Sequence, residues 1–407
     1  MSRKSRRNNK DALRMKNMAK TMEAFGLKER KKQPPKSKKS GPPKASSIRK
    51  HGDEKMASIL ARALAKEGMI ESATHNFHTY PARLHPDSTK LLLPHTTGIV
   101  HDPFCGGGTV LVEAQLAGRE ASGSDLSPIA ELVTRARCAG PELAPLLRSA
   151  SRKIAAKAQL RTDVEVPEVA VKWYEEHVAQ EIGRIRDSIP EYDPKVQPIL
   201  WAVLSSILVK VSYRKSDTSN IREPHHRPPG TTAVLFHKKA RELGRMLDKM
   251  PARPPILFTR GDARLIKPEK KVGLIITSPP YPGVYDYLPM HQLRYAWLGI
   301  EAEEGLGREI GSRRAFRAKG RADALKKWQD DTKQWIANQA SALQEGGAMV
   351  IVVGDGLVGN KLVDALYPTT EAMQASGLTI FARASADRPD HARNAIRIEH
   401  MVMGIKQ

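Results

Sequence analysis

The sequence predicts an α/β fold on a mostly parallel sheet, with an antiparallel edge strand, a helical insert and a basic N-terminal tail. Two observations predict the parallel strands of this sheet. The apolar runs at 98–101 and 272–276 each end abruptly in a turn, and helical patterns separate the runs along the chain. Apolar runs alternating with helices are typical of parallel strands buried on both faces. The segments 378–382 and 396–405 are predicted to form the antiparallel edge.

The N-terminal tail is the most basic part of the chain. The 407 residues hold 67 Lys and Arg against 44 Asp and Glu, a formal charge of +23. Residues 1–50 contain 18 Lys or Arg and 3 Asp or Glu, so most of the excess lies there. This polar segment cannot bury enough apolar surface to order itself, and we expect it to be disordered. Its charge favours a polyanionic partner, most simply nucleic acid; a solvated tail without a specific role is the alternative.

The composition gives little support for a membrane protein or a secreted one. No apolar run approaches the roughly 20 residues of a membrane span, and the chain does not open on a signal peptide. Cys105 and Cys138 are the only cysteines, which fits a reducing compartment. We therefore expect a cytoplasmic, nucleoid-associated protein, or a nuclear one if eukaryotic, without membrane contact; the oligomeric state stays open.

The first glycine-rich turn has the features of a cofactor site. Asp102-Pro103-Phe104-Cys105-Gly106-Gly107-Gly108-Thr109 follows the strand at 98–101, a helix is predicted over 109–117, and Asp125 ends the next strand. Glycines let a cofactor approach the backbone, and the acid is placed to accept from ribose hydroxyls. An acid at the end of the first strand would repel a pyrophosphate and suits a cationic cofactor, which points to S-adenosylmethionine. A tight turn without ligand is the alternative.

Upstream of this turn, residues 75–86 are dense in histidines and aromatic residues. The segment includes Phe77, Tyr80 and Pro81 and reads as a loop lining a binding cleft. A zinc site is the weaker hypothesis, because neither Cys nor carboxylate ligands stand nearby at helical spacing.

Residues 138–250 are predicted to form mainly helices, at 145–160, 169–189, 194–211 and 232–250. A loop between the last two contains Arg214, Lys215 and Arg227, whose mixture with aromatic and amide groups suits phosphate and base contacts. Arg313 and Arg314 belong to a second basic segment, 308–319, predicted to be a mobile loop facing nucleic acid. For the loop that contains Arg214, Lys215 and Arg227, an ordinary solvated loop is the alternative.

The turn Ser278-Pro279-Pro280-Tyr281 is the candidate catalytic element. Two prolines cannot continue the preceding strand, so the chain must turn at the carboxyl edge of the sheet. The turn offers a hydroxyl, free carbonyls and one flat ring, which suit an exocyclic amine on a planar base. Asp262, after the predicted strand 256–259, is a candidate acceptor for the adenine amine of a cofactor.

Together these stretches resemble the S-adenosylmethionine-dependent amino-methyltransferases that modify exocyclic amines of DNA bases. Asp102 to Thr109 is similar to their cofactor loop, Ser278 to Tyr281 to their catalytic tetrapeptide, and Phe77 to Pro86 to their extra cofactor-side motif. The resemblance covers about residues 70–130 and 255–405. It implies a Rossmann-like sheet with a reversed hairpin, a catalytic domain over 51–137 and 251–407, and base flipping. The insert at 138–250 is then a candidate target-recognition region. The implied cofactor-binding residues are Phe77, Tyr80, Pro81, Asp102, Pro103, Phe104, Cys105, Gly106, Gly108, Thr109, Asp125 and Asp262.

The predicted reaction is direct methyl transfer to an exocyclic nitrogen of a flipped base. Ser278 Oγ and the Pro279 carbonyl would accept from the NH2 group, and Tyr281 would stack on the ring. Neither cysteine is placed as the nucleophile that a C5-cytosine mechanism needs. Ser278 in the first catalytic position favours N4 of cytosine over N6 of adenine. Two alternatives remain: an RNA base N-methyltransferase, and a noncatalytic nucleic-acid-binding protein with a relic fold.

Overall fold

The computed structural model describes residues 48–407, except 67, 69–71, 82, 161, 218, 302–306, 319, 359–360 and 391–394. The chain divides into two compact units, Met1–Gly41 and Pro42–Gln407, and the description below concerns the second. The predicted basic tail lies outside the described residues except for its last three. The predicted boundary at residue 50 is slightly late, because strand β1 (Arg49–Gly52) already pairs with the sheet.

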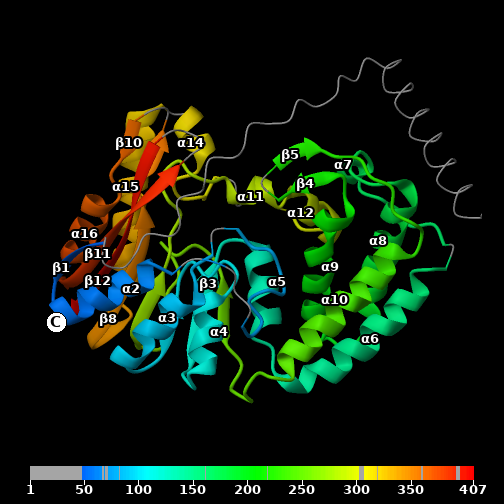
Figure 1. The fold of residues 1–407 in the computed structure, drawn as a ribbon, viewed down its shortest axis with the longest axis horizontal. Helices are drawn as coiled ribbons and strands as arrows, with labels where there is room; N and C mark the ends of the chain where they lie inside the picture. Colours follow the sequence, from blue (N-terminus) through cyan, green and yellow to red (C-terminus); the bar gives the residue numbers. More distant parts are fainter. Residues whose placement is uncertain are drawn as a thin grey trace, which may run out of the picture. The chain divides into compact units, whose positions relative to one another are not determined.

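The sheet confirms the predicted fold class. Within the described residues it has eight strands in the order β1-β11-β12-β8-β7-β2-β3-β6 (Figure 1). The strands β6, β3, β2, β7 and β8 run parallel, whereas β12, β11 and β1 each run antiparallel to the neighbour before them in that series. This is a Rossmann-like sheet that ends in an antiparallel hairpin, as the sequence resemblance implied. The strands are β2 (Val100–Asp102), β3 (Ala121–Asp125), β6 (Leu257–Arg260), β7 (Val272–Thr277), β8 (Leu343–Gly354), β11 (Leu378–Asp390) and β12 (Ala395–Lys406).

Strand β7 shows why the central strands appear in the sequence as continuous apolar runs. All six of its residues are buried. Leu274 and Ile276 pack into one hydrophobic cluster with helix α4 (Thr109–Leu116), whereas Ile275 packs into a second cluster with Trp335 of helix α15 (Arg321–Ala340). Successive side chains of a strand point to opposite faces, so a strand covered on both faces must be apolar throughout.

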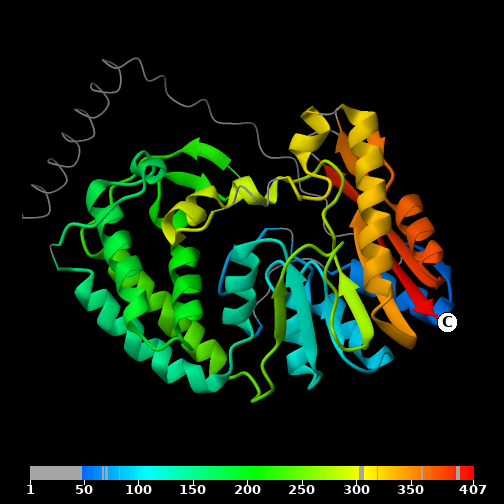
Figure 2. The same ribbon diagram turned by 180° about the vertical axis from the view of Figure 1, so that it is seen from behind.

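Helices cover both faces of the sheet (Figure 1, Figure 2). Helix α4 begins at Thr109, directly after the glycine-rich turn, and ends before Gly118 as predicted. The helices outside the insert are α2 (Glu54–Leu64), α3 (Pro86–Leu92), α4 (Thr109–Leu116), α5 (Pro128–Arg137), α11 (Tyr287–Met290), α12 (Gln292–Leu298), α14 (Arg313–Ala318), α15 (Arg321–Ala340) and α16 (Leu366–Ala375). A small hairpin of β9 (Gly356–Val358) and β10 (Lys361–Val363) lies between β8 and α16 in the chain.

The helical insert occupies the chain between α5 and β6. Its helices group beside α5 (Figure 1, Figure 2), and their apolar residues belong to the same cluster as those of α4 and α5. The insert consists of α6 (Ala144–Lys157), α7 (Glu168–Val171), α8 (Glu176–Ser188), α9 (Gln197–Val211), α10 (Thr231–Leu247) and the hairpin β4 (Arg214–Ser216) and β5 (Ser219–Arg222). The continuous helix predicted over 169–189 is wrong, because the chain leaves the helix at 172–175 between α7 and α8.

One further prediction needs correction. The basic segment 308–319, predicted to be a loop, contains α14, whose Phe316 is buried in the cluster that includes α15. Among the described residues, no helix combines the length and the apolar character needed to cross a membrane.

Candidate active site

The ends of strands β2 and β7 are joined directly. Thr277 Oγ1 donates a hydrogen bond of 2.7 Å to Asp102 Oδ1, and both side chains are buried. Asp102 Oδ1 also accepts from the Phe104 backbone N–H at 3.0 Å. One carboxylate therefore fixes the start of the glycine-rich turn and the residue before Ser278, so two motifs about 175 residues apart meet at one edge of the sheet.

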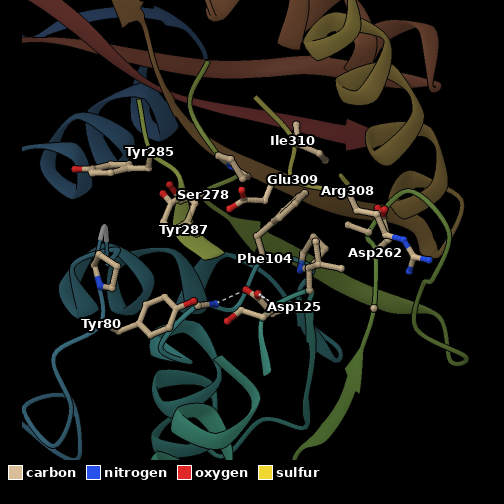
Figure 3. A pocket seen from close by; sticks show the side chains of 18 residues that line it. Tyr80, Phe104, Asp125, Asp262, Ser278, Tyr285, Tyr287, Arg308, Glu309 and Ile310 are labelled. Carbon is tan, nitrogen blue, oxygen red and sulfur yellow. Dashed lines mark hydrogen bonds between the residues drawn. The ribbon is translucent and has the colours of Figure 1, made fainter. Parts of the chain in front are cut away.

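The first cavity lies at this edge and brings nine of the sixteen predicted catalytic and cofactor-binding residues together. Figure 3 shows Tyr80, Phe104 and Asp125 on one side of it and Ser278 with Tyr287 on another. From the predicted set it is lined by Tyr80, Pro81, Pro103, Phe104, Gly106, Asp125, Asp262, Ser278 and Pro280. The glycine-rich turn and the Ser-Pro-Pro-Tyr turn therefore meet at one cavity.

The first cavity is narrow in this structure. It encloses about 100 Å³, whereas pockets for small-molecule ligands measure about 300–1,000 Å³. Tyr285, Tyr287 and the segment 308–310 form part of its wall. A nucleoside-sized ligand therefore requires part of this wall to move outward.

Asp125 holds the glycine-rich turn in place. Its Oδ2 accepts from the Gly106 N–H at 2.8 Å, and its Oδ1 accepts from the Ser127 N–H at 2.8 Å. Burial raises the pKa of Asp125 to about 6, although these amide donors oppose the rise. Each carboxylate oxygen keeps a second lone pair, so Asp125 can also accept from a ligand in the cavity.

A buried arginine that the sequence did not suggest supports the same turn. Arg137, at the end of α5, donates to the carbonyls of Gly107, His75 and His78 over 2.5–2.9 Å. A Cβ at Gly107 would lie 2.4 Å from Arg137 Nη1, so only glycine fits beside the guanidinium. Arg137 thereby ties the glycine-rich turn to the loop that carries Tyr80. Burial lowers its pKa to about 9, and it stays charged at neutral pH.

Some of the predicted cofactor residues lie behind the cavity wall. Phe77 is 1% exposed and packs in the main hydrophobic cluster. Cys105 is buried, and a Cβ at Gly123 of β3 would lie 2.2 Å from its Sγ. The predicted cofactor-binding residues that do not line the first cavity are Phe77, Asp102, Cys105, Gly108 and Thr109.

Asp262 lines the first cavity but already has a strong partner. The guanidinium of Arg264 binds both of its carboxylate oxygens, and Arg264 also pairs with Asp331 at 2.6 Å. Hydrogen bonding and charge from Arg264 lower the pKa of Asp262, although burial opposes this. Asp262 is thus an ionised acceptor whose direction Arg264 fixes.

A second cavity, of about 520 Å³, opens beside the first. The two share Tyr80, Ser278, Tyr285 and Tyr287, so Ser278 lies where they meet. The rest of the second cavity is lined by Ala63, Leu64, Lys66, Gly68, Arg83, Leu84, His85, Ser88, Pro279, Tyr281, Val284, Val352, Arg388, Arg397, Glu399 and Met401. The prolines of the turn thus face different spaces, Pro280 the first cavity and Pro279 the second.

A hydrogen-bond chain orients Tyr281 in the second cavity. Its hydroxyl donates to Glu399 Oε1 at 2.8 Å, and Glu399 Oε2 accepts from Arg388 Nε at 2.8 Å. The ring lies against Gly354, where a Cβ would be 2.5 Å away. The ring is therefore held rigidly, with glycine on β8 making room for it.

The predicted nucleic-acid contacts have intramolecular partners. Arg214 donates to Ser219 O at 2.8 Å and Arg313 to Val284 O at 2.5 Å, while Lys215 pairs with Glu223 at 2.7 Å. Arg227 donates to the Lys210 carbonyl, and Arg314 pairs with Glu309 at 2.9 Å. The Arg313 side chain and the Arg314 backbone N–H, which donates to Asp286 Oδ1 at 2.9 Å, thus fix the segment after the Ser-Pro-Pro-Tyr turn onto α14.

Several lining residues were not predicted. Tyr285 and Tyr287 follow the Ser-Pro-Pro-Tyr turn closely, and this aromatic pair was a signal that could have found them. Arg388, Arg397 and Glu399 lie more than a hundred residues further along the chain, and only the strand pairing places them beside Tyr281.

Comparison with known proteins gives one similar curated sequence. The chain is 22% identical over 266 residues to the type II methyltransferase M.MvaI of Kocuria varians, a match over 57% of this chain and 59% of that protein. The match therefore spans less than two thirds of the relative's length. No family model matches this sequence.

Solved structures give only distant likenesses. TrmN from Thermus thermophilus is 12% identical with a TM-score of 0.28, over 79% of this chain and 49% of that one. The rRNA methyltransferase aviRa from Streptomyces viridochromogenes is 12% identical with a TM-score of 0.30, over 80% of this chain and 88% of that one. These scores are too low to support any argument about this chain.

Proposed function

We propose that the protein transfers a methyl group from S-adenosylmethionine to an exocyclic amine of a flipped base in DNA, with N4 of cytosine favoured over N6 of adenine. One observation carries the proposal: Ser278 lies at the junction of two cavities, one lined by the glycine-rich turn and Asp125, the other by Tyr281. A direct transfer needs two adjoining sites, one for the methyl donor and one for the acceptor, with a polar group between them. The similarity to a type II methyltransferase supports this choice.

The lining of the first cavity suits S-adenosylmethionine in its chemistry. Asp125 provides a carboxylate for ribose hydroxyls or a cationic group, and Tyr80 and Phe104 provide aromatic surface. Asp262 provides an ionised acceptor for an adenine amine. When bound, this cofactor supplies an electrophilic methyl group. The first cavity must widen to admit it.

The catalytic turn acts on the acceptor amine. Ser278 Oγ and the Pro279 carbonyl accept hydrogen bonds from the two N–H groups, which draws the nitrogen lone pair out of conjugation with the ring. Tyr281, held by Glu399 at 2.8 Å, provides a face for the base worth about 1–3 kcal/mol of stacking. As the new N–C bond formed, the bond from the methyl group to the sulfonium sulfur would break, leaving a neutral thioether, and the nitrogen would lose one proton to solvent.

The insert is proposed to contact the duplex as a target-recognition region. A third cavity lies between hairpin β4–β5 and residues 76–81, lined by Lys210, Arg214 and Lys215 among others. Cationic side chains around a cavity beside the loop at 76–81 suit backbone phosphates.

The decisive experiment is nucleoside mass spectrometry of DNA incubated with the protein and S-adenosylmethionine. N4-methylcytosine is the expected product, and Ser278→Ala is expected to lower its yield at least about tenfold, which corresponds to one lost hydrogen bond in the transition state. Asp125→Asn, which keeps only one acceptor oxygen, is expected to weaken cofactor binding in calorimetry by a similar factor. Methyl groups on C5 would refute the direct mechanism, and faster methylation of RNA than of DNA would refute the assigned substrate.

A further inference from the structure

One connection between successive parallel strands carries no helix. The connections from β2 to β3, from β3 to β6 and from β7 to β8 each include at least one helix, but the connection 261–271, from β6 to β7, forms only a short turn at 263–265. A helix in such a connection normally covers the sheet. At β7 this face is covered, because Ile275 packs in one cluster with Trp335 of α15. At β3 and β6 it has no such cover from the connection.

A fourth cavity, of about 750 Å³, lies against this part of the sheet. Three of its lining residues are in register across neighbouring strands: His101 of β2, Ser122 of β3 and Leu257 of β6. Among the described residues it shares no lining residue with the first or the second cavity. It is therefore a separate surface from the candidate active site.

The lining of the fourth cavity includes the two most exposed leucines among the described residues. Leu265 is 70% exposed and Leu257 is 61% exposed. The apolar side chains of Ile99, Pro255 and Ile266 line the same hollow. A projecting leucine beside an apolar hollow is self-complementary in shape, because a two-fold axis lets the leucine of one copy enter the hollow of the other.

The charges of this face also suit a second copy of the chain. The described lining has three cationic side chains and two carboxylates: Arg119, Lys267, Lys270, Glu120 and Glu269. A nucleic acid or an anionic membrane attracts a surface with a large positive excess, which the whole chain has at +23 and this face lacks. A two-fold interface faces itself and therefore needs both signs. Glu120 and Lys270, 3.8 Å apart and mostly exposed, can instead pair across it.

Hydroxyl groups in the lining already have partners, so that covering them costs little. The Ser122 hydroxyl is hydrogen-bonded to His101 Nδ1 at 2.8 Å, and Ser124 Oγ donates to the Pro103 carbonyl at 3.3 Å. Removing a hydrogen-bonded polar group from water costs much less than removing an unpaired one. A partner can therefore cover the hollow with apolar side chains alone.

We propose that this face joins two copies of the chain in a two-fold dimer, with Leu265 of each copy seated in the fourth cavity of the other. The contact is between faces and does not extend the sheet. Strand β6 has only four residues, and Pro254 and Pro255 before it and Arg260 at its end oppose pairing with another strand. The inference does not depend on the proposed function.

The test is analytical ultracentrifugation of the full-length protein, freed of nucleic acid, in about 0.15 M salt. At this ionic strength the Debye length is about 8 Å, so repulsion between the basic copies is screened. The wild-type protein is expected to form a dimer that dissociates on dilution, without larger species. Leu265→Asp is expected to weaken the dimer at least about tenfold, because it places a carboxylate in an apolar hollow. Leu160→Asp is the matched control, since Leu160 is also exposed but does not line this cavity.

A pair of charge variants tests the same face without touching its apolar part. Glu120→Lys makes the face more positive by two charges and is expected to weaken the dimer. Adding Lys270→Glu in the same chain restores the balance of charge and is expected to restore the association. Both side chains are mostly exposed, so these variants are expected to fold as the wild-type protein does.

A wild-type protein that stays monomeric up to about 0.1 mM would overturn the inference. A dimer that is equally tight in Leu265→Asp would do so too, because it would use another face. Species that grow beyond a dimer with concentration would refute the two-fold arrangement. Circular dichroism checks the folding of Leu265→Asp; if that variant is unfolded, the charge variants decide, and a Glu120→Lys dimer as tight as the wild-type dimer would count against this interface.

Discussion

The hydrogen bond between Thr277 and Asp102 can be removed with little change of shape. Thr277→Val replaces the hydroxyl by a methyl group at a fully buried position. A hydrogen bond to an ionised carboxylate is worth about 1.5–3 kcal/mol, and a neutral one about 0.5–1.5 kcal/mol. The loss of unfolding free energy is therefore expected to be larger above the pKa of Asp102 than below it, by about 1 kcal/mol.

The pH dependence follows from the direction of the pKa shift. Burial raises the pKa of Asp102 from 3.8 to about 7, while the Thr277 hydroxyl opposes the rise. Because the folded pKa lies above the unfolded one, the folded chain binds more protons between these values, and stability falls as the pH rises through this window. Without the hydroxyl the folded pKa rises further, by about one unit for each 1.4 kcal/mol, and the fall continues above pH 7.

Urea unfolding at pH 5 and pH 8.5 measures both effects. Thr277→Ser, which keeps the hydroxyl, is the control; it is expected to lose stability equally at the two pH values, because it removes only a buried methyl group. An identical loss at both pH values for Thr277→Val would show that Asp102 does not ionise in this range. No loss at all would refute the role of this bond in joining the two turns.

Two further substitutions test the parts beside this bond. Gly107→Ala is expected to lower the unfolding free energy by about 1–3 kcal/mol, because the buried Arg137 cannot yield to the new methyl group. The control Gly307→Ala is expected to change it little, because nothing lies within 4 Å of the added Cβ. Thermal unfolding compares the two variants, and equal shifts in their unfolding temperatures would contradict the packing argument. Tyr281→Phe keeps the stacking face but loses the bond to Glu399, so methyl transfer in single turnovers is expected to fall by less than about tenfold, and by more in Tyr281→Ala. Equal rates for the Tyr281→Phe and Tyr281→Ala variants would show that the aromatic ring does not contribute to methyl transfer.

The strands and turns around the site were readable from the sequence because their causes are local. A run such as 272–277 must be buried on both faces, and the prolines after Ser278 end it wherever it lies. The glycines at 106–108 and the acid at 125 likewise indicate a strand-turn-helix unit. The convergence of the two turns followed from one rule, that parallel strands bring their carboxyl ends to one edge.

Other features depended on contacts that local patterns do not encode. Strand β1 has only four residues, all exposed, and exists because it pairs with β11 at the sheet edge. Phe77 lies within the predicted cleft loop, yet it packs into the core beneath that loop. The five predicted nucleic-acid contacts had a suitable composition, but composition does not show which intramolecular acceptor a cation finds.

The sequence by itself determined the order of the strands along the chain, the two turns and the chemistry of their side chains. Only the tertiary structure decided which side chains face a common space: it placed Arg137 beneath the glycine-rich turn and set Arg388 against Arg397 beside Tyr281. The physical reason is that hydrophobic periodicity shows how much of a residue is buried. Strand register, fixed by hydrogen bonds between segments far apart in the chain, determines what the residue is buried against.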